Sequence, residues 1–141
     1  MASGKNNYWS ARLLNMLNGA VGTIPTPLFL ALYTVAPTVS TAGTEAPAAG
    51  NYGRVSITGN VANWPTITVP TTTMTSGAAF TFAVASADWA AAANMVAAAL
   101  LDVVTQGAGN MFYFGSLTVS KPVFNGDTAN FPTGSVTIQE L

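Results

Sequence analysis

The chain has 141 residues, enough for one domain with a hydrophobic core, and carries only four Lys/Arg and five Asp/Glu residues. Its formal net charge of −1 provides no basic surface for a phosphate backbone, so we expect no nucleic-acid partner. Histidine and cysteine are both absent from the sequence, which excludes disulfides, thiolate metal sites and a Ser–His–Asp catalytic arrangement.

Charged residues make up 6% of the chain, against about a quarter in an ordinary soluble domain. A surface with so few charges lacks the hydrated, mutually repelling groups that keep free proteins apart in solution. We therefore expect much of the surface to be buried against another protein. No uninterrupted apolar run reaches the length of about 18 residues that a membrane-spanning helix needs, so we expect no membrane partner.

Residues 8–17 have the pattern of one short helix, which Asn18 and Gly19 would end. The apolar residues that fall on one face of this helix are Trp9, Leu13, Met16 and Leu17. A helix of three turns is marginally stable alone, so it must dock either on its own domain or on a neighbouring subunit. We assign residues 1–22 to an N-terminal arm with this helix, and residues 23–141 to a single β-sandwich domain.

Beyond the helix the pattern is typical of β-structure. The apolar run 28–34 predicts a strand buried on both faces, whereas residues 36–51 have no periodicity and predict a long loop. β-branched residues predict strands at 52–58 and 67–69. In the predicted strand 79–84, alternation places three apolar residues on one face, namely Phe80, Phe82 and Val84.

The segment 86–104 supports two interpretations. Ser86 or Asp88 would cap an alanine-rich helix, and alanine has the highest helix propensity. Residues 95–104 also have the composition of a buried strand, followed by a glycine-rich turn and the apolar run 111–114. Intrinsic propensity favours the helix, whereas the symmetrical arrangement around the turn favours a strand hairpin.

The C-terminal part of the chain completes the β pattern. Residues 117–123 predict a strand that is weakened by Pro122, residues 125–127 predict a turn, and residues 135–138 predict a last alternating strand. Short strands broken by glycine and proline indicate an all-β fold. We predict an antiparallel, jelly-roll-like β-sandwich with a short N-terminal helix.

No residue pattern marks a catalytic or metal site. The five acids are widely separated along the chain: Glu45, Asp88, Asp102, Asp127 and Glu140. We interpret Asp88 as a cap or turn residue and Asp127 as a turn residue. Ser120 and Lys121 are neighbours on a predicted strand, so their side chains point to opposite faces and form no catalytic pair. We therefore expect no enzyme activity, no metal and no cofactor.

Aromatic side chains are the remaining candidates for binding. They can stack on sugars, as a receptor-binding lectin requires, but in a charge-poor β domain they more often anchor a core or an interface. The aromatic residues in question are Trp9, Trp64, Trp89, Tyr8, Tyr33, Tyr52 and Tyr113. Arg54, one of only four basic residues, is a candidate for a specific partner contact or for an internal ion pair.

Short motifs in a fixed order run along most of the chain, at residues 30–38, 43–45, 50–55, 87–89, 109–117, 120–121, 126–127 and 134–138. In this order they resemble a family of small virion proteins of tailed bacteriophages. Members of that family are often labelled tail-fibre proteins, and some similar β-sandwich proteins serve as capsid cement (decoration) proteins. The resemblance extends from Tyr8 to Leu141. The alanines of residues 90–99 depart from the pattern, in which β-branched residues are expected there.

The resemblance implies a strand at about 95–104 that forms a hairpin with residues 111–117, and it supplies no catalytic residue. We favour a capsid cement protein, made in the host cytoplasm and bound as a homotrimer to the major capsid protein on the exterior of an icosahedral head. Binding energy alone would stabilise the shell. The expected interface includes the loop 36–51 together with Tyr8, Trp9, Arg12, Glu45, Tyr52 and Arg54.

The alternative is a tail-fibre or tail-tip module that recognises a host-surface glycan through stacked tryptophan and tyrosine side chains. The label of the family favours this alternative. The sequence supports it less, because we find no long shaft segment, no repeat that would build one, and few polar side chains beside the aromatic residues.

Overall fold

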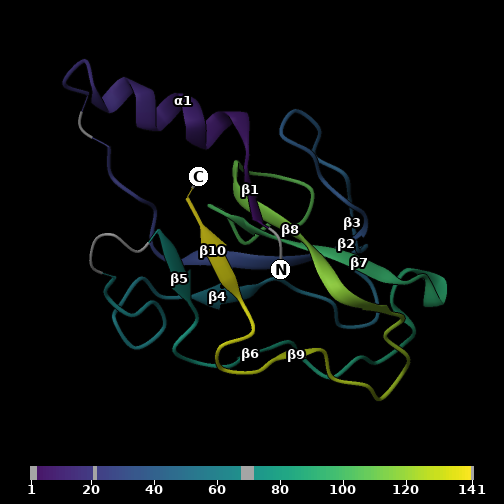
Figure 1. The fold of residues 1–141 in the computed structure, drawn as a ribbon. Helices are drawn as coiled ribbons and strands as arrows, with labels where there is room; N and C mark the ends of the chain where they lie inside the picture. The colour runs from purple at the N-terminus through teal and green to yellow at the C-terminus, as the bar shows by residue number, and fades with distance from the viewer. Residues whose placement is uncertain (1–2, 21, 68–71, 141) are drawn as a thin grey trace.

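The computed structural model describes residues 3–20, 22–67 and 72–140. Within these ranges it has a six-stranded antiparallel sheet, two smaller two-stranded sheets and one short α-helix (Figure 1). The predicted fold class, an all-β antiparallel sandwich with a short N-terminal helix, is confirmed.

The six-stranded sheet has the order β1, β8, β7, β2, β3, and β4 also pairs with β2. Its strands are β1 (Ser3–Lys5), β2 (Leu28–Val35), β3 (Thr44–Glu45), β4 (Val55–Ile57), β7 (Met95–Leu101) and β8 (Met111–Lys121). At the centre of the sheet, Ala98 pairs with Leu32 on one side and with Gly115 on the other. Both faces of β2 and β7 are covered here, which explains why these strands are continuous apolar runs.

A second layer lies across one face of this sheet. The ribbon of β6 (Phe80–Thr81) and β9 (Asn130–Phe131) runs below the sheet in Figure 1, and β5 (Thr73–Thr75) pairs with β10 (Thr137–Gln139) at one side. The large side chains enclosed between the layers include Leu30, Leu32, Ile57, Phe80, Phe82, Trp89, Leu100 and Val136. Removing each such side chain from water stabilises the fold by about 1.5–3 kcal/mol.

The alanine-rich segment is a strand, so the hairpin of β7 and β8 is confirmed and the helix interpretation is wrong. The residues before β7, Trp89–Ala92, form a short turn in which Ala90, Ala91 and Ala92 have φ values of 49°, 52° and 63°. These left-handed values are incompatible with a right-handed α-helix. Trp89 is fully buried and its indole Nε1 donates a hydrogen bond to the Gly50 carbonyl at 2.7 Å. This long-range anchor outweighs the helix propensity of the alanines.

The strand that follows the hairpin turn is longer than expected. Residues 117–123 are not a separate strand, because β8 is continuous to Lys121 and Pro122 only ends it. The turn at 125–127 is confirmed, since the carboxylate of Asp127 accepts a hydrogen bond from the Phe124 amide at 3.0 Å. The last predicted strand is present as β10, shifted toward the C-terminus.

Other predicted boundaries also change. Val84 is 56% exposed and does not share the buried face of Phe80 and Phe82, because β6 ends at Thr81 and the alternation stops there. The predicted loop 36–51 contains the two-residue β3, and the predicted strand 52–58 shortens to β4. Of the predicted strand 67–69, residues 68–69 lie outside the described residues and residue 67 is not in a strand.

The N-terminal helix α1 (Asn7–Met16) confirms the predicted helix. Asn6 caps it, since its side-chain oxygen accepts a hydrogen bond from the Tyr8 amide at 2.9 Å. Trp9, at 6% exposure, packs on Phe112 of β8 with 4.9 Å between the ring centres. The first half of α1 therefore docks on its own domain. None of the described helices has the length and apolar character to cross a bilayer.

Candidate functional site

The expected interface residues fall into two groups in the structure. Glu45 of β3, Tyr52 and Arg54 form a buried cluster beside the sheet, and Tyr8, Trp9 and Arg12 lie on α1. Tyr8, Glu45 and Arg54 meet at one polar cavity of about 380 Å³, which the sequence could not show. Trp9 lines a separate apolar cleft of about 530 Å³.

The buried cluster is built around an ion pair between Arg54 and Glu45. Arg54 Nε donates to Glu45 Oε1 at 2.8 Å and Nη2 donates to Oε2 at 2.7 Å, with the two side chains 1% and 5% exposed. Arg54 Nη1 also donates to the carbonyls of Val103 and Ala108, at 2.7 and 3.0 Å. Of the two roles expected for Arg54, the structure therefore shows the internal ion pair.

Two further donors hydrogen-bond to the carboxylate of Glu45. The Tyr52 hydroxyl donates to Oε1 at 3.0 Å, and the Gly107 amide donates to Oε2 at 2.9 Å. Burial lowers the pKa of Arg54, but the hydrogen bonds and charge of Glu45 outweigh burial and raise it. The Arg54 guanidinium therefore keeps its charge, and both side chains are fully hydrogen-bonded. It acts as a clip that holds β3, the segment before β4 and the turn after β7 together.

Two tyrosines beside this clip stay protonated at neutral pH. Burial raises the pKa of Tyr33 to about 12, and the negative charge of Glu45 adds to that effect. Burial also raises the pKa of Tyr52, whose hydroxyl accepts a hydrogen bond from the Leu32 amide at 3.0 Å. Both side chains are therefore neutral, and the Tyr52 hydroxyl is a hydrogen-bonding group of the fold.

In the second group, Trp9 connects α1 to residues near both termini of the chain. Trp9 Nε1 donates to the Tyr113 hydroxyl at 2.7 Å, and that hydroxyl donates in turn to Glu140. Lys5 Nζ pairs with the other oxygen of Glu140 at 2.6 Å. Burial raises the pKa of Glu140, but the hydrogen bonds from Lys5 and Tyr113 outweigh burial and lower it. Residues near both termini are thus bonded to the same tyrosine.

Arg12 is less completely bonded. Its Nη1 donates to the Tyr8 hydroxyl at 3.1 Å and its Nη2 donates to the Thr23 carbonyl, while its buried Nε has no partner among the described residues. Arg12 therefore ties α1 to the chain that leads into β2. Whether these six residues contact another subunit stays a prediction.

The aromatic residues that were candidates for stacking on sugars are buried or partly buried. Trp9, Tyr33, Tyr52 and Trp89 are buried, and the remaining three, Tyr8, Trp64 and Tyr113, are partly buried. Tyr52 packs edge-on against Trp89 with 5.0 Å between ring centres. Their observed role is packing, which leaves no fully exposed ring among them.

The sequence pattern did not single out the exposed apolar side chains on the outer half of α1. Leu14 is 66% exposed, Met16 is 47% exposed and Leu17, just after the helix, is 86% exposed. Met16 and Leu17 were expected on one face with Trp9 and Leu13, but Trp9 is buried and Leu13 half-buried, whereas Met16 and Leu17 are exposed. The sequence does contain a sign of this exposure. Apolar residues lie on more than one face at the end of this short helix, so they cannot all pack on the sheet.

The chain was also compared with known protein families and with curated proteins. A family model described as podophage GP4 fiber I protein gp80 matches residues 4–139, nearly the whole chain. No curated protein matches the chain. The match agrees with the resemblance to small phage virion proteins. The chain belongs to the podophage GP4 fiber I protein gp80 family, which indicates a structural role in the phage virion.

Proposed function

We propose that the protein is a non-catalytic subunit of the fibre apparatus that assembles with further copies of itself, as a homotrimer, through the outer half of α1. The observation that carries the proposal is the exposure of Leu14 and Leu17, at 66% and 86%, on a helix whose other end is docked. Large apolar groups exposed side by side indicate a surface that a partner covers.

The part of α1 beyond Arg12 carries no charged residue. The helix has no acidic residue in its first turn and no basic residue in its last turn, and its one charged residue, Arg12, is bonded to Tyr8 and Thr23. Covering this surface therefore removes apolar groups from water without the cost of desolvating a charge. A second copy of the chain suits it, because a formal net charge of −1 produces little repulsion between copies.

The apolar surface continues beyond the helix. The cleft of about 530 Å³ that Trp9 borders is lined mainly by apolar side chains, and on its rim Ile24, Val61 and Ile67 are 59%, 71% and 41% exposed. The charged residue in its lining, Glu140, is already paired with Lys5. An apolar helix end from a second copy matches this cleft in chemistry. This match supports contact between copies.

A fibre position fits the family description, and a capsid cement role is the second candidate. Exposed apolar side chains on several other parts of the chain favour cement, which must contact more than one capsid subunit: Val35, Val39, Val84, Val104, Val119 and Phe124. The covered aromatic residues argue against a module that binds glycans by ring stacking. Both candidate positions use the same mechanism, burial of uncharged surface.

Labelling of intact virions separates the two positions. Gold-labelled antibody against this protein, viewed by electron microscopy, should mark the tail, and quantitative mass spectrometry should give a copy number that matches the symmetry of the fibres. Label over the whole head, with a copy number that follows the number of capsid subunits, would replace the fibre proposal with cement. Absence of the protein from purified virions would contradict both.

A further inference from the structure

The last third of β8 is a strand that no neighbouring strand covers. β1 pairs with residues 113–115 of β8, whereas β7 pairs with it as far as Ser116 and then again at Lys121. Between these points, residues 117–120 have no pairing partner on either edge within the described ranges. An extended stretch with unpaired main-chain N–H and C=O groups is a template on which another strand can form.

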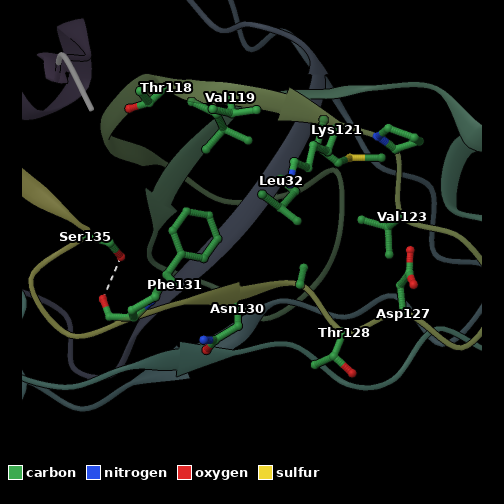
Figure 2. Close-up of a pocket in the computed structure, with 15 residues that line it drawn as sticks. Leu32, Thr118, Val119, Lys121, Val123, Asp127, Thr128, Asn130, Phe131 and Ser135 are labelled. Carbon is green, nitrogen blue, oxygen red and sulfur yellow. Dashed lines mark hydrogen bonds between the residues drawn. The ribbon is translucent and has the colours of Figure 1, made fainter.

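A cleft of about 590 Å³ lies between this stretch and β9 (Figure 2). Val119 extends into it from β8 and Phe131 from β9, and the buried side chains of Leu32 and Met95 also line it. Val119 itself is 62% exposed. The apolar interior between the two layers is therefore open to the outside along residues 117–121.

The chemistry of the cleft is that of a peptide site. Asn130 and Phe131 are neighbours on a strand, so their side chains lie on opposite faces, and the Asn130 side chain accepts a hydrogen bond from the Thr81 hydroxyl at 2.7 Å. The occupant must therefore offer apolar groups to the cleft and main-chain groups to residues 117–120. An extended peptide segment offers both, because its side chains alternate between two faces while its N–H and C=O groups point along its edges.

Lys121 restricts the charge of this segment. It lines the cleft at the end of β8, and its ammonium group has no hydrogen-bond or ion-pair partner in the part of the chain that the structure describes. Asp127 also lines the cleft, but its Oδ2 accepts a hydrogen bond from the Phe124 amide at 3.0 Å. A carboxylate of the segment placed at Lys121 would accept a charge-assisted hydrogen bond.

The same requirement argues against a second copy of this chain as the occupant. Each of the five acidic side chains already accepts a hydrogen bond inside its own fold: Glu45, Asp88, Asp102, Asp127 and Glu140. A second copy would have to break one of these bonds to offer a side-chain carboxylate to Lys121. A different protein matches the site better.

We propose that the uncovered edge of β8 binds an extended segment of another virion protein, which adds to the sheet as an antiparallel strand. The segment has apolar residues at alternate positions and an acidic residue at its N-terminal end. Antiparallel pairing continues the arrangement of β1, which lies along the same edge of β8. In this orientation the acidic residue lies opposite Lys121, and the apolar residues lie opposite Leu117 and Val119 and cover the cleft beside Phe131. The site uses none of the α1 surface proposed for contact between copies.

A titration of the ¹⁵N-labelled full chain tests the proposal, with the capped peptide acetyl-ETVTVT-amide (one-letter code) as the probe. It should produce saturable amide shifts in residues 116–121 and at Phe131, with a dissociation constant in the millimolar range. Acetyl-KTVTVT-amide places a second positive charge at Lys121 and should bind about tenfold or more weakly. The first peptide with every backbone amide methylated keeps its side chains but has no main-chain donor, so it should also bind about tenfold or more weakly.

Reversing the charge of the protein provides a matched pair of variants. Lys121→Glu changes an exposed side chain at a strand end, so the fold should be retained, and this variant should prefer acetyl-KTVTVT-amide. Ser120→Glu adds a negative charge at the adjacent residue, which does not line the cleft, and should leave the natural order of preference unchanged.

Several outcomes would overturn the proposal. They are an absence of saturable shifts, shifts outside the cleft, equal binding of the three peptides, and a Lys121→Glu variant that still prefers the acidic peptide. Shifts in residues 117–121 that grow with the concentration of the chain alone, before any peptide is added, would show that a second copy occupies this edge and would overturn the proposal as well.

Discussion

The guanidinium of Arg54 and the carboxylate of Glu45 form two parallel hydrogen bonds, of 2.8 and 2.7 Å, in a pocket that leaves the side chains 1% and 5% exposed. Removing one partner of such a pair leaves the other charge buried and uncompensated. We expect Arg54→Met to lower the free energy of unfolding by about 3–5 kcal/mol, measured by urea denaturation followed by tryptophan fluorescence.

The double replacement Glu45→Leu with Arg54→Met is the control for this pair. Because it removes both charges together, it should be less destabilised than Arg54→Met alone. Two results would contradict the role of the pair as a buried clip. One is a loss of less than about 1 kcal/mol in the free energy of unfolding of Arg54→Met. The other is a loss in the double variant equal to the sum of the losses in Arg54→Met and Glu45→Leu.

The pKa of Glu140 makes part of the stability depend on pH. Its folded-state pKa lies below the usual value of 4.5, because the hydrogen bonds from Lys5 and Tyr113 outweigh burial. Its contribution is therefore present above pH 4.5 and is lost as the pH falls through the lower folded pKa. The side chain is 39% exposed, so we expect Glu140→Gln to cost less than about 1 kcal/mol at pH 7.

Thermal unfolding at pH 7 and at pH 2.5 checks this dependence, the latter about two pH units below the usual pKa of a glutamate. The difference in melting temperature between the natural chain and Glu140→Gln should be clear at pH 7 and should shrink at pH 2.5. A difference that is equal at both pH values, or that grows in acid, would show that the hydrogen bonds of Glu140 do not depend on its charge.

The backbone at Gly50 holds Trp89 and should not accept a side chain. Gly50 has φ +61°, and an added Cβ would lie 2.7 Å from the Ala87 carbonyl oxygen and 3.1 Å from Trp89 Cδ1. We expect Gly50→Ala to destabilise the fold by about 1–3 kcal/mol. Gly53 is the matched control, since a Cβ there meets no described atom within 4 Å. Equal melting temperatures for the two variants would contradict this account of the turn.

The left-handed turn before β7 predicts a change in the opposite direction. Ala91 has φ 52° and ψ 44°, a conformation that costs a residue with a side chain about 1–2 kcal/mol. Ala91→Gly should therefore raise the free energy of unfolding by about 0.5–1 kcal/mol after the entropy of glycine is included. The same replacement at Ala11, on an exposed face of α1, should lower it by about 1 kcal/mol. Loss of stability in both variants would rule out the left-handed turn.

The parts of the fold that the sequence predicted are those with a local pattern. The apolar run of β2 and the symmetrical arrangement of β7 and β8 around a glycine-rich turn are visible within a few residues. The turn at Trp89–Ala92 was not predictable in this way, because Trp89 is held by the Gly50 carbonyl, 39 positions earlier. Alanine propensity is a weak preference that such a contact overrides.

The candidate sites depend even more on contacts that are distant in the sequence. Lys5 and Glu140 are 135 positions apart, so no spacing rule could pair them. Arg54 and Glu45 are nine positions apart, yet their pairing requires β3 and the segment before β4 to lie together. The exposed position of Leu14 follows only from the angle at which α1 leaves the sheet.

We propose that copies of the protein assemble with one another through the outer half of α1 and that this assembly is needed for incorporation into the virion. The most direct test measures incorporation of Leu14→Ser with Leu17→Ser into particles, by quantitative mass spectrometry of purified virions, together with sedimentation of the isolated protein. Val104→Ser, at a similarly exposed apolar position outside α1, is the control. The double variant should fold normally but sediment as a monomer and be lost from virions, while the control should be retained. A double variant that assembles and is incorporated like the natural chain would contradict it.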